Sequence, residues 1–216
     1  MDYTIDTAIT LNTGDEVSFR AKSDRSAQSP YTYFYFMMTG KIEAWHNVMS
    51  LYRTNDFSTY DTVVNYAFYR LFRGCTSLIK APDLPATTLA SACYGYMFSG
   101  CQSLTKAPAL PATTLYSNCY EGMFYTCQSL TEAPALPATT LAEACYWGMF
   151  FNCQSLKEVR ISATTTTATN ALTDWLGGVS ATGDFYCDPN ATIFPTDSVS
   201  GIPANWKRHN IADYPN

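Results

Sequence analysis

The chain has 216 residues, a formal net charge of −5 and a pI of about 4.9. Its longest basic run is Lys207-Arg208, so it lacks the basic surface of a typical nucleic-acid-binding protein. No apolar run approaches the roughly 18 residues that a membrane-spanning helix needs, and we expect no membrane insertion. The opening residues lack a signal-peptide pattern, so either the protein is intracellular or a leader has been removed. We favour the second and expect an extracellular or cell-surface protein.

Residues 1–60 are expected to form a β-rich N-terminal cap. Their alternating or apolar stretches, residues 9–20 and 31–38, are separated by the turn-forming residues Gly14, Pro30 and Gly40. A cap of this kind covers the open end of a stacked repeat array.

A 26-residue unit then recurs almost verbatim at residues 75–100, 101–126 and 127–152. Its pattern is C-x-S-L-x-x-A-P-x-L-P-A-T-T-L-x-x-x-C-Y-x-x-M-F-x-x. A fixed period of this length indicates stacked units, which usually bind partners rather than transform them. Degenerate copies on both sides extend the repeat region to residues 61–180.

Each unit is predicted to contain a short strand, an extended turn and a helix. In the second unit the strand runs from Ser103 to Ala107, and a Leu-Pro-Ala-Thr-Thr-Leu turn follows. The third unit shows a capping box from Thr140 to Glu143 before the predicted helix of about twelve residues.

The three copies divide the predicted helix into two faces. We call equivalent positions in successive units, 26 residues apart, a slot. At about 100° per residue, the slots whose residues differ between copies fall on one half-cylinder of the helix, and the slots with identical residues fall on the other. We therefore predict a buried face and a solvent face. The buried face comprises Cys93, Tyr94, Met97, Phe98 and Cys101, and the solvent face comprises Ser91, Gly95, Tyr96 and Ser99.

The eight cysteines are interpreted as buried free thiols. Seven of them fall in two columns at the repeat spacing, and the flanking copies have Ala67, Ala171 and Val179 in the same slots. Small apolar residues fit these slots, so packing explains them. Disulfides between stacked units remain an alternative. The spacing matches no zinc motif, and we expect neither metal nor cofactor.

Residues 181–216 are expected to form an irregular C-terminal cap. A turn-rich loop leads to Trp206, whose ring is predicted to cover core that the last repeat leaves exposed.

The units resemble the BspA-like leucine-rich repeats of surface and secreted proteins from Bacteroidales. The L-P-A-T-T-L-x-x-x-C-Y-x-x-M-F-x-x-C-x-S-L-T segment carries the resemblance, which covers about residues 60–180. It implies an α/β leucine-rich-repeat solenoid, with a parallel sheet on one side and helices on the other. For function it implies adhesion or binding of a host protein.

The strongest candidate for a partner-binding site is the variable half of the predicted helices. Tyr125 and Phe151 share a slot in adjacent units, and Trp147 precedes Phe151 by four residues, so stacking is expected to bring the three together. The alternative is that the C-terminal segment folds over them. The full candidate set is Tyr96, Glu121, Tyr125, Glu143, Trp147 and Phe151.

Two other candidate sites are weaker. On the strand side one slot is occupied by Lys80, Lys106, Glu132 and Glu158, which an ordinary solvated sheet face explains. The only histidines, His46 and His209, lie in the two caps, so a Cys-His catalytic pair needs a coincidence of folding. We expect no enzymatic activity.

These observations favour a non-enzymatic interaction or adhesion module that binds a protein or glycan partner and is itself a monomer. The alternative is a structural or receptor-binding component of a phage or surface appendage. A stable trimer in solution would favour that alternative.

Overall fold

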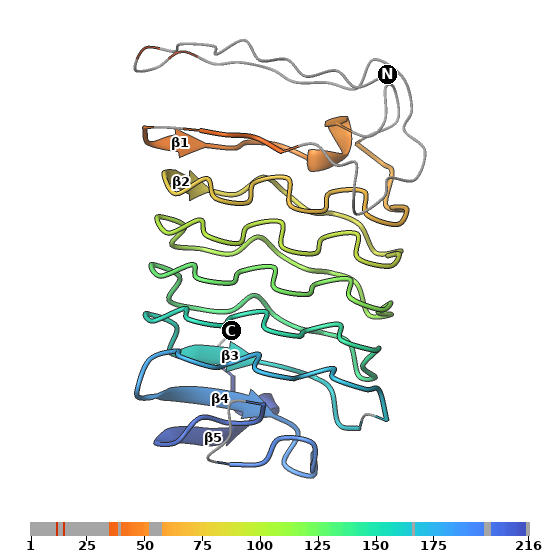
Figure 1. The fold of residues 1–216 in the computed structure, drawn as a ribbon. Helices are drawn as coiled ribbons and strands as arrows, with labels where there is room; N and C mark the ends of the chain where they lie inside the picture. Colours follow the sequence, from red (N-terminus) through yellow and green to blue (C-terminus); the bar gives the residue numbers. More distant parts are fainter. Residues whose placement is uncertain are drawn as a thin grey trace.

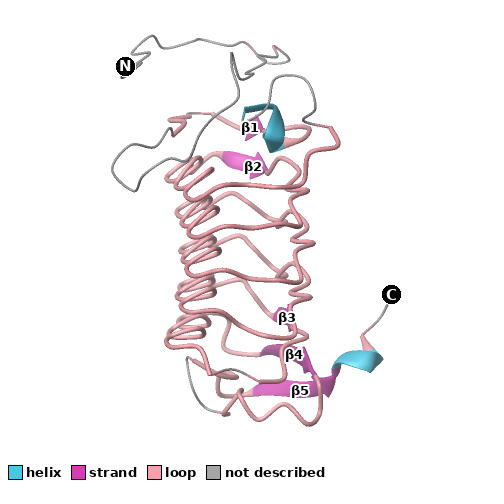
Figure 2. Cartoon of the chain, turned by 90° about the vertical axis from the view of Figure 1, so that its right-hand side faces the viewer, coloured by secondary structure: helices cyan, strands magenta, loops and turns pink. Residues whose placement is uncertain are grey.

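The computed structural model describes residues 12, 15, 35–38, 40–51, 58–165, 167–196 and 200–214. The repeat units lie one above another (Figure 1), and a view turned by 90° shows the same stack from the side (Figure 2). Backbone hydrogen bonds join each unit to the next, as from the Phe98 amide to the Met123 carbonyl at 2.9 Å. The 26-residue period therefore sets the spacing of the layers.

Regular secondary structure is confined mainly to the two ends of the stack. The two sheets are parallel, with strand orders β1-β2 and β3-β4-β5. Between them, isolated parallel bridges join neighbouring units, as at Thr88 and Thr114. The elements are β1 (Ile42–Glu43), η1 (Val48–Leu51), β2 (Leu78–Lys80), β3 (Glu158–Arg160), β4 (Gly183–Cys187), β5 (Trp206–Asn210) and η2 (Ile211–Asp213).

The predicted α/β leucine-rich-repeat solenoid is wrong. In the residues that the structure describes, the only helices are the short 3₁₀ segments η1 and η2, and no continuous parallel sheet runs along the repeats. Residues 91–100, 117–126 and 143–152, expected to be helices, are runs of hydrogen-bonded turns. We call these segments, with the equivalent residues 65–74 and 169–178, the turn runs.

The hydrogen bonds explain why a turn run is not a helix. Within residues 92–101, alternate amides donate to the carbonyl three residues back, as from Met97 to Tyr94 at 3.2 Å. The amides between them donate to the carbonyl 25 residues ahead, as from Tyr96 to Glu121 at 2.7 Å. An α-helix bonds each amide four residues back within the same segment. Half of the donors here instead hold two layers together.

The backbone dihedral angles repeat every four residues along each turn run. In the first full unit φ is 52° at Ala92, 53° at Tyr96 and 79° at Gly100. A positive φ at the third residue of a turn is what a type II turn requires. The buried residues therefore recur every four residues, and this spacing is so close to the 3.6-residue helical period that two buried pairs and Cys101 cannot distinguish turns from a helix.

The predicted buried face is confirmed despite the wrong secondary structure. Cys93, Met97, Phe98 and Cys101 have no exposed surface, and Tyr94 is 1% exposed. Identical rings stack from layer to layer. The Phe98, Phe124 and Phe150 ring centroids lie 5.7 Å apart at each step. Burial of these apolar columns stabilises the stack.

The predicted solvent face is partly wrong, because Gly95 and Ser99 are buried. The ring of Tyr69, from the preceding layer, lies over Gly95, where an added Cβ would come within 2.9 Å of Cδ2. A helical wheel of one unit cannot show a side chain that arrives from another layer.

The C-terminal end of the stack closes around two tryptophans. Trp175 is fully buried and packs edge-on against Phe185 at 6.0 Å. Trp206 is 8% exposed, belongs to the core and donates from its indole nitrogen to the Ser180 carbonyl at 2.8 Å. The prediction that Trp206 covers the end of the core is confirmed.

At the other end, β1 pairs with β2, and the Phe36 ring stacks on Phe72 at 5.3 Å. Most of the expected β-rich cap, residues 1–60, lies outside the described residues. Within that cap, residues 35–38 form no strand.

Candidate functional site

The candidate site lies on the half-exposed side chains of the five turn runs, which we call the turn face. Aromatic rings on this face lie over glycines of the next layer. Tyr96 occupies the space where a side chain of Gly122 would be, and an added Cβ at Gly177 would come within 2.8 Å of the Phe151 ring. The glycines thus make room for large rings that are neither buried nor fully exposed.

Tyr96 is further fixed by hydrogen bonds across the layers. Its hydroxyl donates to Glu121 Oε1 at 2.8 Å, and Asn118 Nδ2 donates to the other carboxylate oxygen at 2.8 Å. Burial and then the hydrogen bond to Glu121 raise the pKa of the Tyr96 phenol above its ordinary value. The phenol therefore stays protonated, and it orients the Glu121 carboxylate.

The structure brings together two of the three aromatic residues predicted to meet. The Tyr125 and Phe151 rings stack with their centroids 5.0 Å apart and an interplanar angle of 15°. Among the described residues, no ring contact joins Trp147 to either of them. All three side chains are half-buried and Glu143 is exposed, so nothing covers them completely.

Three residues of the turn face were missed at the sequence level: Tyr66, Tyr69 and Arg70. Tyr69 meets Tyr66 and Tyr96 edge-on at 5.5 and 6.1 Å. The Arg70 guanidinium carbon lies 4.9 Å from the centre of the Tyr69 ring and 5.5 Å from that of Tyr96. These residues lie 26 positions before variable slots of the first full unit. Applying the repeat spacing to the degenerate copy at residues 61–74 would therefore have identified them.

At the C-terminal end of the stack, the strand side binds the last described residues of the chain, which follow β5. Tyr214, which follows η2, donates a 2.5 Å hydrogen bond to Glu158 Oε1 on β3, and its ring lies 4.0 Å from the Arg160 guanidinium carbon. The Tyr186 ring meets Tyr214 edge-on at 4.9 Å. These side chains already bind one another. Lys80, Lys106 and Glu132 remain exposed, as expected of a solvated face.

The structure places His209 beside a carboxylate rather than a thiol. Its Nε2 lies 2.7 Å from Asp184 Oδ1, and its ring stacks on Tyr186 at 4.8 Å. Cys187, at the end of β4, has no exposed surface. The arrangement therefore offers no Cys-His pair at His209.

The structure confirms the prediction of buried free thiols, since all eight cysteines are free and buried. In one column each thiol donates to the carbonyl of a phenylalanine in the preceding layer, as from Cys127 to Phe98 at 3.1 Å. Burial raises the pKa of the Cys75 thiol to about 11 and that of Cys153 to about 12. These thiols are protonated and inaccessible at neutral pH.

The native protein at pH 8 is therefore expected to react only slowly with a thiol reagent, while all eight cysteines react after denaturation without reductant. Absorbance of the released reagent measures both. A sample reduced before denaturation serves as the control. If two or fewer thiols reacted in the unreduced denatured sample, the cysteines would be paired.

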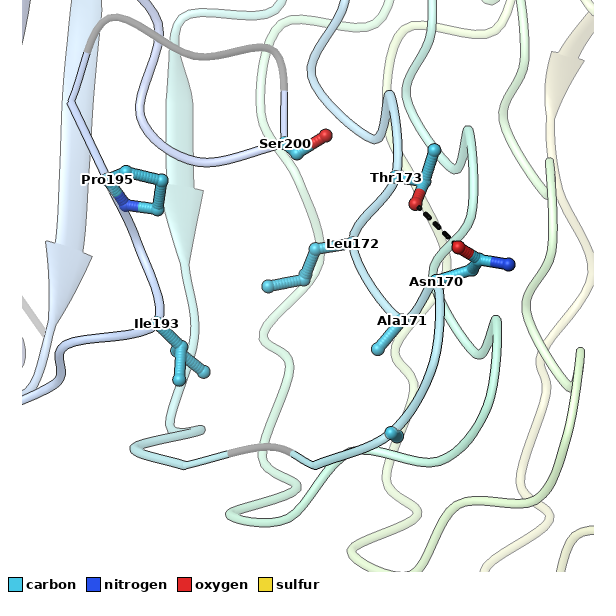
Figure 3. Close-up of a pocket in the computed structure, with 8 residues that line it drawn as sticks. Asn170, Ala171, Leu172, Thr173, Ile193, Pro195 and Ser200 are labelled. Atoms are coloured by element: carbon cyan, nitrogen blue, oxygen red, sulfur yellow. Dashed lines mark hydrogen bonds between the residues drawn. The ribbon is translucent and has the colours of Figure 1, made fainter.

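The depression in Figure 3 lies between the last turn run and the tail and has a volume of about 260 Å³. Among its polar side chains, the Thr173 hydroxyl donates a hydrogen bond of 3.5 Å to the Asn170 side-chain oxygen. It is lined by Ala168, Asn170, Ala171, Leu172, Thr173, Ile193, Pro195 and Ser200. None of these side chains titrates near neutral pH, so the lining supplies the hydroxyls of Thr173 and Ser200 but no acid or base to activate them.

Over the described ranges, no group of three His, Cys, Asp or Glu side chains is placed to hold a metal ion. None of the helices in these ranges has the length and apolar character needed to cross a membrane.

No protein-family model, no curated protein and no solved structure matches this chain. The resemblance to BspA-like proteins therefore gains no support from these comparisons, and the described residues do not form the leucine-rich-repeat fold that it implied.

Proposed function

We propose that this chain is a non-enzymatic interaction module that binds a protein partner through the turn face, outside the cell or at its surface. One observation carries the proposal: the slots that differ most between otherwise near-identical repeats carry half-exposed aromatic residues. Tyr125 and Phe151 replace Ser99, and Trp147 replaces Gly95. Packing of the core does not require these changes.

The chemistry of the face supports a protein partner. Aromatic side chains lose little conformational entropy on binding and dominate the energetics of protein interfaces. Here stacking and the underlying glycines already fix several rings, so less entropy is lost when a partner binds. Tyr96, Glu121 and Glu143 add polar groups beside the aromatic centre, as at the rim of a protein interface.

The test replaces the aromatic residues with those that occupy the same slots in the first unit: Tyr125→Ser, Trp147→Gly and Phe151→Ser. The wild-type and triple-variant proteins are compared by capture from surface-protein extracts, and each captured protein is then purified and titrated. Since the new residues already occur in the fold, the variant should fold, which circular dichroism verifies. We expect binding to weaken at least about tenfold, as loss of about 1.4 kcal/mol or more implies.

A matched control carries Thr113→Ala and Thr139→Ala, which are exposed but lie outside the turn runs. It should bind like the wild type. Equal binding by the wild type and the aromatic variant would refute the turn face as the site. Binding of purified glycans but not proteins, lost in the same variant, would replace the protein partner with a glycan.

A further inference from the structure

The turn face already holds one guanidinium group against aromatic rings. The guanidinium carbon of Arg70 lies 4.9 Å from the centre of the Tyr69 ring and 5.5 Å from that of the Tyr96 ring. Both distances are within the roughly 6 Å at which the face of an aromatic ring attracts a cation. The spacing of these slots therefore places a planar cation beside an aromatic ring.

Three repeats further along the chain, the same slots carry different residues. Where the first turn run has Tyr69, the fourth has Trp147. The slot of the arginine is occupied by Gly148, and the slot of the second ring is occupied by Asp174. Tryptophan attracts cations more strongly than tyrosine does. The fourth and fifth turn runs therefore present a stronger ring and an anion, and the residue between them has no side chain.

Two further carboxylates lie in slots next to Trp147. Glu121 has the slot of Trp147 one layer earlier, and backbone hydrogen bonds join the two layers there. Glu143 lies one turn earlier in the same run. Glu143 and Trp147 each precede a residue with positive φ, 48° at Ala144 and 56° at Gly148, so they occupy equivalent places in successive turns. All charged side chains of the last three turn runs are acidic.

The ring and two of the carboxylates are accessible to a partner. Trp147 and Asp174 are half-buried, and Glu143 is exposed. Among the described residues, no cation lies over the Trp147 ring, and no hydrogen bond or ion pair engages the carboxylate of Glu143 or Asp174. Gly148 is buried, and an added Cβ would lie 3.7 Å from the Tyr125 ring. A cation therefore reaches Trp147 from the solvent side.

The chemistry of these slots favours a guanidinium group over an ammonium group. A guanidinium is planar and weakly hydrated, stacks on aromatic faces and donates two parallel hydrogen bonds to a carboxylate, whereas an ammonium is a strongly hydrated point charge. Glu121 adds negative potential but is less available, because Tyr96 and Asn118 already donate hydrogen bonds to its carboxylate oxygens.

We propose that the protein partner binds the turn face through an arginine side chain that stacks on Trp147 and pairs with Glu143 and Asp174. This inference rests on the proposed function and names the chemistry that the partner presents to the same face. Stacking and ion pairing act on the same group, so each holds it in place for the other.

The test measures binding of fluorescently labelled tetra-arginine to the full chain by fluorescence anisotropy, beside tetra-lysine and tetra-citrulline. Citrulline has the shape of arginine without its charge. We expect tetra-arginine to bind most tightly and tetra-citrulline at least about tenfold more weakly, because the uncharged group loses both the cation–π attraction and the ion pairs. Raising the salt concentration should weaken the binding of tetra-arginine by screening the ion pairs.

Two variants locate the binding site. Trp147→Gly introduces the residue that Gly95 has in the same slot, and we expect it to bind tetra-arginine about threefold more weakly or worse. Glu143→Gln combined with Asp174→Asn is expected to weaken binding by at least about threefold. The matched control, Glu43→Gln combined with Glu132→Gln, makes the same change in net charge at exposed residues away from the turn face. The control should bind within about twofold of the wild type, since the net charge acts only weakly through salt.

Several outcomes would overturn the arginine site. They are the absence of tetra-arginine binding up to about 1 mM, equal binding of tetra-lysine or tetra-citrulline, and equal weakening in the control and in the carboxylate variant. In each case the proposed function still stands if capture from extracts yields a protein that the triple aromatic variant loses. The proposed function fails separately if no captured protein distinguishes that variant from the wild type.

Discussion

Replacing Gly122 with alanine is expected to lower the free energy of unfolding by about 2–3 kcal/mol. The φ angle at Gly122 is 55°, a region that costs an L-residue about 1–2 kcal/mol. The new methyl group would also collide with the Tyr96 ring. Displacing that ring breaks its hydrogen bond to Glu121, at a cost of about 1 kcal/mol. Denaturant titration followed by tryptophan fluorescence measures the change.

Two further substitutions in the next turn run measure the cost of positive φ separately from the collision with a ring. Gly148→Ala has the same positive φ, 56°, but the nearest atom is 3.7 Å from the added Cβ, so we expect a loss of only about 1–2 kcal/mol. Ala144→Gly, at φ 48°, is expected to stabilise by about 1 kcal/mol. In a helix all three signs would reverse, because alanine is favoured over glycine by about 1 kcal/mol. Stabilisation by Gly148→Ala would therefore contradict the turn runs.

Phe124→Ala is expected to cost about 3–5 kcal/mol, the usual range for removing a buried aromatic ring. The Phe124 ring has no exposed surface and stacks between the rings of Phe98 and Phe150, each 5.7 Å away. Its loss opens a cavity in the middle of the stack and separates the two halves of the column. The midpoint of thermal unfolding should fall by about 6–20 °C at this chain length.

A matched variant in the neighbouring column is expected to behave in the opposite way. Tyr120 is 1% exposed, and its hydroxyl has no hydrogen-bond partner within the described part of the chain. Burial of an unpaired hydroxyl costs about 1–3 kcal/mol. Tyr120→Phe keeps the stacked ring and is therefore expected to be neutral or stabilising. A loss above about 1 kcal/mol would show that the hydroxyl forms a bond, for example to a buried water molecule.

The error in secondary structure has a definite physical origin. Cys93 and Tyr94, then Met97 and Phe98, then Cys101 recur every four residues, and both a helix and a run of turns bury such a pattern on one side. A sign of the turns was nevertheless present. Glycine and asparagine recur at every fourth position in several copies, as at Asn118 and Gly122, and both residues tolerate positive φ better than most.

The sequence could predict which residues belong to the candidate site, but not how they contact one another. Variation between copies indicated Tyr125 and Phe151, and the structure stacks them. It did not indicate that Tyr96 reaches across a layer to Glu121, or that Tyr214 returns to Glu158 from 56 residues away. These contacts depend on how the layers lie against one another.

The sequence by itself determined the 26-residue period and the apolar columns, because each repeated side chain must meet its own copy in the next layer. Only the tertiary structure decided that the repeats contain turns rather than helices. The deciding hydrogen bonds join amides to carbonyls 25 residues ahead, as from Phe98 to Met123. A local sequence pattern reflects only the secondary-structure propensity of its own segment, whereas these hydrogen bonds form only when two layers lie against each other.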